Sequence, residues 1–375
     1  MRSAGAGAAT AGFDYLRVGL ALAVLAWHSI ILSTGSTPLD QALWSGPFRF
    51  LPAAILPMFF AVSGFLVAAS LERTRLHQFL MLRVLRIVPA LAVVVVLSAL
   101  FLGPIFTTLP LRQYLMSPEL VQYFGNTVGL MHFTLPGVFE NNPDPRLIAS
   151  QLWTIPFEFE CYLALAILSL SSLLRDRRAF VEVIALVSLA GTACALLFAP
   201  VSAFDHVPGE VLVLSFLAAV SLYLYRDKIP YSTLLGVVAA MMSAALLQIP
   251  NAAYLAPFPV AYLTVWLGLQ RPPKIPFGDL SYGIYLLHFP IEQTIMHLYP
   301  GAGSWWRLTL IALPPTLVCA WLSWNCIEQP ILSRKTTILA AIDCAWATAA
   351  RFGWTLLRGR EPTPTNQSDA ATGAD

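Results

Sequence analysis

Long, uninterrupted runs of apolar residues, each about 18 to 22 residues long, alternate with short polar stretches along the chain. A membrane helix needs a continuous apolar run of this length, whereas a membrane strand alternates apolar and polar positions. The pattern therefore predicts an all-α, polytopic integral membrane protein rather than a β-barrel. We expect about ten transmembrane helices, near residues 13–34, 52–71, 82–102, 151–173, 179–199, 207–225, 231–249, 252–269, 280–299 and 304–326.

Composition strengthens this prediction. The 375 residues are 57% hydrophobic and only 11% charged, whereas soluble domains carry about 25% charged residues. Most of the surface must therefore face lipid. The formal net charge of +2 gives no bulk attraction to nucleic acid, so no nucleic-acid partner is expected. No metal site is expected either, because the cysteines lie in apolar segments without metal-like spacing: Cys161, Cys194, Cys319, Cys326 and Cys344.

Basic residues are distributed unevenly between the two sets of loops. One set, with the C-terminal segment, holds most of them, whereas the opposite loops hold only Arg49, Arg112, Arg146 and Arg307. Because cytoplasmic loops carry the excess of Lys and Arg, both termini are predicted to lie in the cytoplasm. The basic set comprises Arg73, Arg75, Arg83, Arg86, Arg175, Arg177, Arg178, Arg226, Lys228, Arg271, Lys274, Arg334, Lys335, Arg351, Arg358 and Arg360.

The same pattern gives a domain plan. Residues 1–12 form a cytoplasmic N-terminal segment and residues 13–330 form the membrane domain. Residues 331–357 are predicted to be an amphipathic helix at the membrane interface, because charges interrupt their apolar character. Residues 358–375 are polar and are predicted to be a disordered cytoplasmic tail. The irregular, aromatic loop at 103–150 is expected to be a partly re-entrant lid over a site.

Two titratable side chains lie deep in the predicted spans. His28 is eleven residues beyond Arg17, which places it ~16 Å deeper in the first span. Glu158 lies about seven residues into the fourth span, at a similar depth counted from the outer end. A buried carboxylate beside an imidazole can orient it and raise its basicity. The alternatives are a histidine bonded to a neighbouring carbonyl and a structural glutamate.

Charged groups also occur at the cytoplasmic ends of spans. Arg83 and Arg86 share a helix face, and their planar guanidinium groups suit phosphate, although they could serve only to set the topology. Asp14 and Arg17 are three residues apart and can pair as a helix-end salt bridge. His288, in the ninth span, is expected to face the same interior as His28, or to be structural.

Five stretches, in this order, carry a resemblance to a known family: "FDYLRVGLALAVLAWHS", "FFAVSGFLVAASLERTRLHQFLMLRVLRIVPAL", "LWTIPFEFECYL", "LSYGIYLLHFPI" and "CIEQP". Together they resemble the acyltransferase-3 family of integral-membrane proteins, which O-acylate sugars of cell-surface glycans such as O-antigen and exopolysaccharide. The resemblance spans positions 13 to 330. It implies a multi-pass protein of the cell inner membrane that contacts lipid, takes its acyl group from acyl-CoA and holds no permanent cofactor.

Roles for single residues follow from the resemblance. His28 looks like the essential histidine of the first helix, and Glu158 like the acidic residue of a W-x-x-x-x-E motif. The pair Arg83 and Arg86 looks like the R-x-x-R motif that serves acyl-CoA. Supporting positions that match the family pattern are Asp14, Arg17, Ser63, Gly64 and, in the ninth span, His288.

Together these observations predict an acetyl-CoA-dependent O-acyltransferase acting on a glycan or a lipid-linked sugar. His28 would serve as general base with Glu158 aligning its ring, or would accept the acyl group transiently. The aromatic stretch Tyr123–Phe139 is a candidate platform for the sugar. A transporter or flippase of a polar metabolite or glycolipid is the main alternative, and it predicts an internal repeat that the sequence lacks. A structural membrane protein is the third class, but it would not need buried histidines and a glutamate together.

Overall fold

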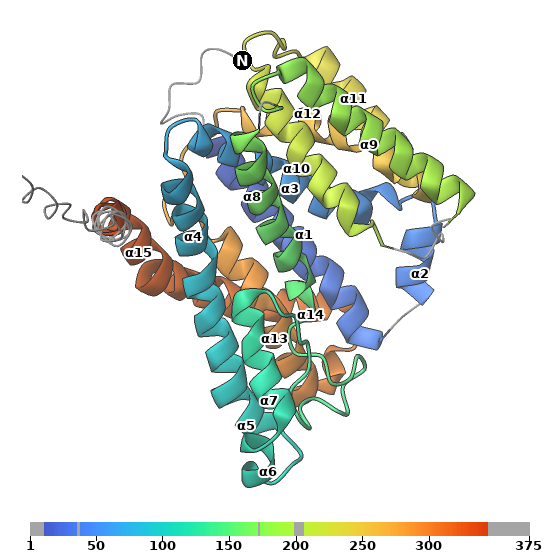
Figure 1. Cartoon of the computed structure of the whole chain (residues 1–375). Helices are drawn as coiled ribbons and strands as arrows, with labels where there is room; N and C mark the ends of the chain where they lie inside the picture. The colour runs from blue at the N-terminus through green and yellow to red at the C-terminus, as the bar shows by residue number, and fades with distance from the viewer. Residues whose placement is uncertain (1–10, 36–37, 172, 199–205, 344–375) are drawn as a thin grey trace, which may run out of the picture. The chain divides into compact units, whose positions relative to one another are not determined.

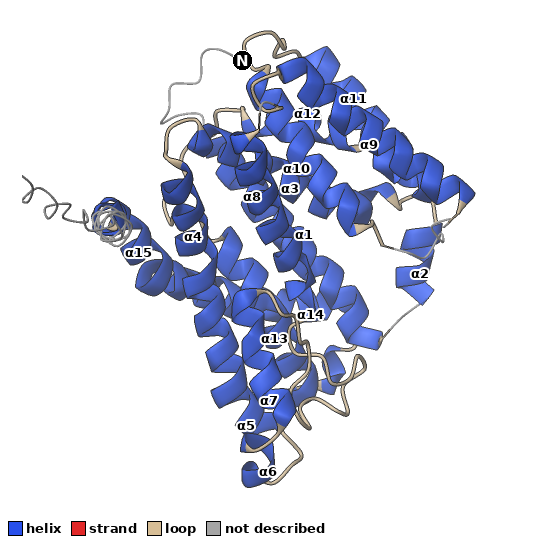
Figure 2. Ribbon diagram, in the orientation of Figure 1, coloured by secondary structure: helices blue, strands red, loops and turns tan. Residues whose placement is uncertain are grey.

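The computed structural model describes residues 11–35, 38–171, 173–198 and 206–343. These residues form helices and loops without any β-strand, as Figure 2 shows. The all-α class is therefore confirmed for the part of the chain that the structure describes. Most of the predicted N-terminal segment and the whole of the predicted tail at 358–375 lie outside these residues.

Each of the ten apolar segments predicted from the sequence contains a helix (Figure 1). The helix boundaries lie within six residues of the predicted ones, because each helix follows an apolar run. The α-helices are α1 (Ala11–Thr34), α2 (Pro38–Ser45), α3 (Phe50–Leu71), α4 (Leu76–Leu97), α5 (Gly103–Phe106), α6 (Leu111–Leu115), α7 (Pro118–Tyr123), α8 (Ile155–Leu170), α9 (Arg177–Leu197), α10 (Gly209–Leu224), α11 (Thr233–Gln248), α12 (Pro257–Gly268), α13 (Ser281–Leu298), α14 (Trp305–Ser323) and α15 (Gln329–Ser333).

Six helical segments among the described residues are long and apolar enough to cross a bilayer, which makes the chain polytopic. Two shorter apolar helices, α10 and α11, have 16 residues each, and α12 has 12. The count of ten spans and the cytoplasmic location of both termini stay predictions. The six segments are Ala11–Thr34, Phe50–Leu71, Leu76–Phe106, Ser150–Leu170, Arg177–Leu197 and Trp305–Ser333.

Wide π-helical turns interrupt two of the long segments. One, η1 (Ser98–Leu102), continues α4 towards α5, so this segment is longer than the predicted 82–102. The other, η6 (Trp324–Glu328), follows α14 and ends on a glutamate that is 3% exposed. A π-turn inserts one extra residue into a helix and so rotates the side chains that follow it. In this chain η6 turns Glu328 into the protein interior.

Close helix packing fixes the frame around the interior. Helix α3 packs along α10, and a Cβ atom at Gly64 would lie 2.1 Å from the carbonyl oxygen of Phe216. Only glycine allows this approach of the two backbones. Helix α1 packs against α13 and α14. The outward faces carry large exposed apolar side chains, as expected for lipid contact, among them Ile167, Leu186, Leu196, Leu310 and Trp321.

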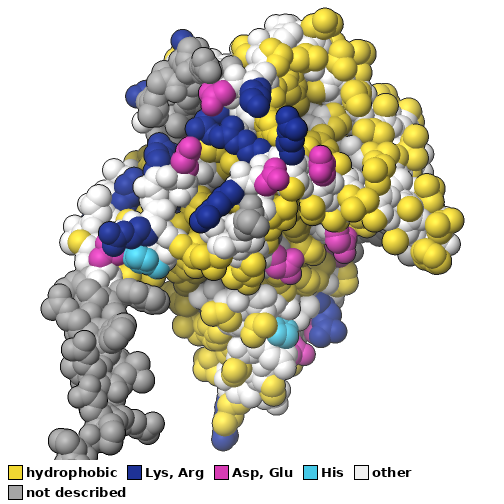
Figure 3. Space-filling model, turned by 45° about the horizontal axis from the view of Figure 1, so that its top comes forward, with side chains coloured by type: hydrophobic (Ala, Val, Ile, Leu, Met, Phe, Trp, Pro, Cys, Tyr) yellow, Lys and Arg dark blue, Asp and Glu magenta, His cyan; other side chains and the backbone are white. Residues whose placement is uncertain are grey.

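The chain divides into two compact units, residues 1–330 and residues 331–375. In the second unit, residues 335–343 are helical, and the rest of the predicted interfacial helix at 331–357 lies outside the described residues. On the face drawn in Figure 3, Lys and Arg side chains gather on the left, and hydrophobic side chains cover most of the right. Arg73, Arg175 and Arg226 lie in turns between helices of the first unit.

Candidate active site

Two histidines from distant parts of the chain meet in the interior. The Nδ1 atom of His28 on α1 lies 2.9 Å from the Nε2 atom of His288 on α13. The ring centroids are 5.0 Å apart. His288 is fully buried, whereas His28 is half-buried. The structure thus makes His288 the direct partner of His28.

Hydrogen bonding fixes where the protons lie on this histidine pair. The Nδ1 atom of His288 is 3.0 Å from the carbonyl oxygen of Ile284, which can only accept a hydrogen bond. His288 therefore carries its proton on Nδ1 and presents an unprotonated Nε2. That atom accepts from Nδ1–H of His28, which leaves the lone pair of His28 on Nε2. His28 is thereby set up as a base or a nucleophile at a single nitrogen.

A second contact between α1 and α13 lies beside the histidine pair. The hydroxyl of Ser29 donates to Oε1 of Glu292 at 2.6 Å, and both residues are fully buried. Oε2 of Glu292 has no hydrogen-bond partner among the described residues. The sequence analysis passed over Glu292. Its position four residues after His288 was the available signal, because that spacing puts both side chains on one helix face.

Glu158 does not contact His28, so its expected role in aligning the His28 ring is wrong. Its carboxylate accepts a hydrogen bond from the Tyr162 hydroxyl one turn along α8. The expectation rested on similar depths of Glu158 and His28 in the bilayer. Depth along two helices does not determine which way each side chain points, and here the two point into different cavities.

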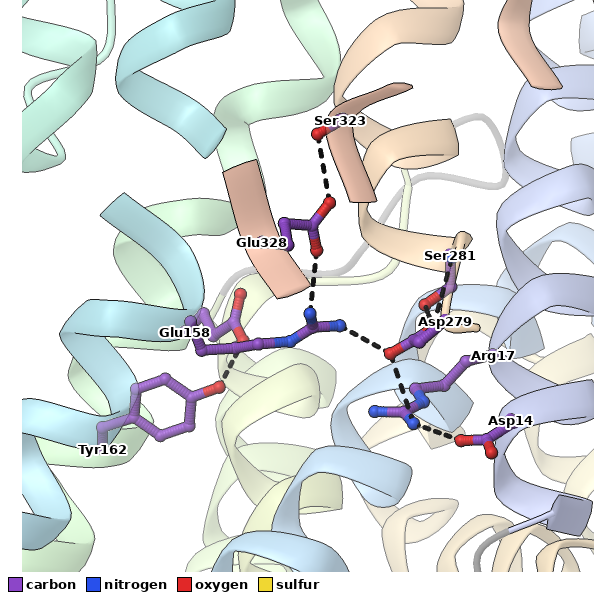
Figure 4. Close-up of polar contacts among 9 residues, drawn as sticks. Asp14, Arg17, Glu158, Tyr162, Asp279, Ser281, Ser323 and Glu328 are labelled. Carbon is purple, nitrogen blue, oxygen red and sulfur yellow. Dashed lines mark hydrogen bonds and ion pairs between the residues drawn. The ribbon is translucent and has the colours of Figure 1, made fainter. Parts of the chain in front are cut away.

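An ion-pair network joins four segments near the start of α1 (Figure 4). Arg86 donates to Asp279 at 2.6 Å and to Glu328 at 2.8 Å. Arg17 pairs with Asp14 at 2.6 Å, as the sequence predicts, and also lies 3.3 Å from Asp279. The network thus holds two guanidinium groups against three carboxylates.

Asp279, just before α13, lies at the centre of this network. Burial alone would raise the pKa of its carboxyl, but Arg17 and Arg86 outweigh burial and hold the pKa at about 2. The hydroxyl of Ser281 donates to the same carboxylate at 2.5 Å. Asp279 is therefore a firmly ionised anchor. Because two carboxylates occupy the Arg86 guanidinium, this arginine is poorly placed to attract a further anion.

Arg83 has different surroundings from Arg86. No ion pair joins it to a carboxylate in the described part of the chain, and its nearest hydrogen bond is a long one of 3.4 Å to Ser70. Its Nε atom is buried without a partner among the described residues. Its guanidinium lies 5.9 Å from the ring centre of Tyr162. Of the R-x-x-R pair, Arg83 therefore offers the available donors.

Two cavities lie beside these polar groups, one at the histidine pair and one at the arginines. The histidine cavity, about 430 Å³, is lined by residues that include His28, Trp27, Trp44, Trp153 and Asp144. The arginine cavity, about 150 Å³, is lined by residues that include Arg17, Ser63, Arg83, Arg86, Glu158 and Tyr162. Leu56 and Tyr285 line both cavities and so form their common wall. The Tyr285 hydroxyl is held by the carbonyl oxygen of Gln151 at 2.5 Å and by Thr154 at 2.6 Å.

The aromatic loop between α5 and α8 is partly buried. Tyr123 and Phe139 are both fully buried, whereas Val128 and Leu130 are 70% and 65% exposed. An isolated bridge between Thr107 and Val138 joins two parts of the loop. The two aromatic residues that bound the stretch therefore belong to the core, and a sugar platform at Tyr123–Phe139 stays a prediction.

Comparisons with known proteins indicate an acyltransferase. Residues 10–325 match the sequence profile of the acyltransferase domain that defines the acyltransferase-3 family. Nodulation protein 10 from Rhizobium leguminosarum bv. viciae is 30% identical over 359 residues, covering 88% of this chain and 95% of that protein. The O-acetyl transferase of Shigella phage Sf6 is 24% identical over 353 residues, covering 88% of this chain and 98% of that protein. No solved structure matches.

Proposed function

This chain belongs to the acyltransferase-3 family, and we propose that it is an O-acyltransferase of the cell inner membrane. The proposed reaction moves a short acyl group, acetyl first of all, from cytoplasmic acyl-CoA to a hydroxyl of a cell-surface or lipid-linked glycan. Similarity to a phage O-acetyl transferase over most of both chains supports this reaction. The six apolar helical segments support a multi-pass location.

The histidine pair is the observation that carries the proposal. His288 orients His28 so that the Nε2 lone pair of His28 is available beside a cavity. In direct transfer, Nε2 of His28 takes the proton of the acceptor hydroxyl while the oxygen of that hydroxyl attacks the thioester carbonyl carbon. The carbon–sulfur bond then breaks, and the thiolate of CoA takes the proton back from His28. The His288 contact stabilises the imidazolium that forms between these two steps.

A covalent route would use the same nitrogen. Nε2 of His28 would attack the thioester, release CoA and pass the acyl group to the acceptor hydroxyl in a second step. The two routes differ in one measurable species. The covalent route predicts radiolabelled protein after an acid quench of a reaction without acceptor, whereas direct transfer predicts none.

The arginine cavity is the proposed donor site. Arg83 is the guanidinium there that lacks a carboxylate partner among the described residues, and phosphate is the anion that acyl-CoA brings. The volume of about 150 Å³ is below the range for whole drug-sized ligands, which favours a short acyl thioester over a long chain. Arg86 also lines the arginine cavity, but Asp279 and Glu328 hold its guanidinium, so its role there is structural and it does not bind the donor.

The function is tested with purified protein in lipid nanodiscs. CoA release from acetyl-CoA and transfer of label to an acceptor are both measured. His28→Ala should lower transfer by about 10²–10⁴-fold, the usual contribution of a general base. His297→Ala is the matched control, because the His297 ring packs on Phe106 and Phe139 and lines neither cavity. Full activity of the His28 variant would refute the proposed chemistry.

The donor site makes a separate prediction. Arg83→Gln should raise KM for acetyl-CoA by about 10- to 100-fold, which corresponds to the loss of one charge-assisted hydrogen bond. Arg86→Gln should instead lower thermal stability, because the buried Glu328 and the partly buried Asp279 lose their partner. Steady-state kinetics and thermal melting of the two variants check this division. Equal effects on KM for both variants would contradict it.

A further inference from the structure

We propose that the histidine cavity is the acceptor site and that it recognises a pyranose ring through Trp27, Trp153 and the Asp144 carboxylate, with Trp44 supporting Trp27. This inference rests on the proposed acyl transfer to a glycan. It adds the place where the acceptor binds and the side chains that select a pyranose over an acyclic polyol.

The size and position of the cavity suit an acceptor. Its volume of about 430 Å³ lies in the range of small-molecule binding sites. His28 forms part of its wall, so a bound hydroxyl group would lie beside the Nε2 lone pair. The arginine cavity lies on the other side of Leu56 and Tyr285. Donor and acceptor would therefore meet at His28 from two directions.

The three tryptophans come from three separate segments and are held in fixed orientations. Trp27 on α1 and Trp44 on α2 meet edge to face, with ring centroids 5.6 Å apart. The guanidinium of Arg49 lies 4.9 Å from the Trp44 ring centre. Trp153 in η3 (Ser150–Thr154) meets Phe157 edge to face at 5.8 Å. Trp44 is only 4% exposed and therefore supports Trp27, whereas Trp27 and Trp153 are half-buried. Packed indole rings such as these offer flat apolar surface at little entropic cost on binding.

A pyranose matches such a surface because one face of the ring exposes mainly C–H groups while its rim carries hydroxyl groups. The C–H face can pack on an indole face, and the hydroxyls need hydrogen-bond partners at the edge of the contact. Ser150 and Asp144 line the same cavity and can supply these partners. An acyclic polyol has the hydroxyls but lacks the flat face.

Asp144 is placed to accept such hydrogen bonds. No hydrogen bond or ion pair engages its carboxylate within the described ranges, whereas its backbone oxygen accepts from Gln293 at 2.8 Å. Gln293 lies on α13, five residues after His288. Asp144 is thus tied to the helix that carries the second histidine. Burial raises the pKa of its carboxyl, as expected for an acidic group kept partly from water.

The lining of the cavity disfavours other ligands. It contains no Lys or Arg side chain among the described residues, so a phosphate-rich donor has no counter-charge there. It contains the Asp144 carboxylate, which a lipid acyl chain would leave without a hydrogen-bond partner. The donor therefore belongs to the arginine cavity and a sugar to the histidine cavity.

The test compares acceptors and variants in the nanodisc assay. The probes are the methyl pyranosides of glucose, galactose, mannose, rhamnose and N-acetylglucosamine, with sorbitol as the acyclic control. We expect acetyl transfer to at least one pyranoside and not to sorbitol. Trp153→Ala should raise KM for that pyranoside at least tenfold more than it raises KM for acetyl-CoA. Trp153→Phe, which keeps an aromatic face, should recover most of this loss.

Trp321→Ala is the matched control, because Trp321 is 46% exposed on α14 and lines neither cavity. It should leave both KM values unchanged. The inference is overturned if Trp153→Ala and Trp321→Ala behave alike, if sorbitol is acylated as well as the pyranosides, or if acetyl-CoA is consumed in a His28-dependent way while no pyranoside is acylated. Absence of any His28-dependent acetyl-CoA turnover would instead refute the proposed function, and this inference with it.

Discussion

At the scale of single residues, a buried histidine gains its chemical role from its neighbour. A buried histidine that donates a hydrogen bond to a nearby carbonyl oxygen can be purely structural, and His288 makes such a bond to Ile284. His28 is bonded to the other nitrogen of that same ring, which forces its lone pair onto Nε2. The structural role expected for an isolated histidine thus fits His288, and the same bond leaves the Nε2 lone pair of His28 unengaged by His288.

This arrangement predicts the effect of changing His288. His288→Phe removes the acceptor for Nδ1–H of His28, so kcat for acyl transfer should fall by about 10²–10⁴-fold while KM for acetyl-CoA stays the same. His288→Gln keeps an oxygen that can accept this hydrogen bond and should lose less activity. Steady-state transfer rates across pH 5 to 9 measure the effect. If His288→Phe keeps wild-type kcat, His288 has no part in orienting His28.

At the scale of elements, partly buried ion pairs connect helices that otherwise pack through apolar side chains. Arg86 links α4 to the segment before α13 and to η6, and Arg17 adds α1 through Asp279. Removing one partner of such a network is costly, because the others are left charged and buried. The π-turn η6 contributes to the same ion-pair network, since it ends on Glu328, which contacts Arg86.

The network predicts a dependence of stability on pH. Folding lowers the pKa of Asp279 from 3.8 to about 2, so this group stabilises the folded state by about 2 kcal/mol above pH 5. That contribution is lost as pH falls below 4 towards 2, where the unfolded and then the folded carboxyl take up a proton. The difference in melting temperature between wild type and Asp279→Asn should therefore shrink from pH 6 to pH 3. A constant difference over this range would show that Asp279 is not the group that titrates.

At the scale of the whole molecule, a thin wall separates the two cavities. Leu56 and Tyr285 line both sides, and the Tyr285 hydroxyl is held by two hydrogen bonds. The acyl group of a donor in the arginine cavity must pass this wall to reach His28. Leu56, an aliphatic side chain, is the part of the wall that no hydrogen bond can hold.

Filling this passage should separate donor binding from transfer. Leu56→Trp adds bulk between the cavities, so acyl transfer should fall by a factor at least about tenfold larger than the loss of acetyl-CoA binding, because Leu56 lines the donor cavity as well as the passage. Equilibrium binding of labelled acetyl-CoA and the rate of transfer check the two effects. Leu310→Trp, at a position 60% exposed on α14, is the control for added bulk. Transfer at the wild-type rate in Leu56→Trp would mean that the acyl group takes another path.

The sequence by itself determined the helices and most of the polar candidates. Continuous apolar runs dictate membrane helices because the bilayer core leaves backbone groups no other partner. Charged residues inside such runs stand out for the same reason, which is why His28, Glu158 and Arg83 could be selected. Helix α2 was missed because it is only eight residues long and is not an apolar run.

Only the tertiary structure decided which of these groups meet. Rotation of each helix about its axis sets the direction of every side chain, and periodicity in a uniformly apolar run does not reveal it. The partner of His28 is therefore His288 and not Glu158, and Arg83 rather than Arg86 keeps free donors. Tyr123 and Phe139 of the aromatic loop became part of the core, while tryptophans from three separate segments came to line one cavity. Each of these outcomes depends on packing between helices, which involves residues far apart in the sequence.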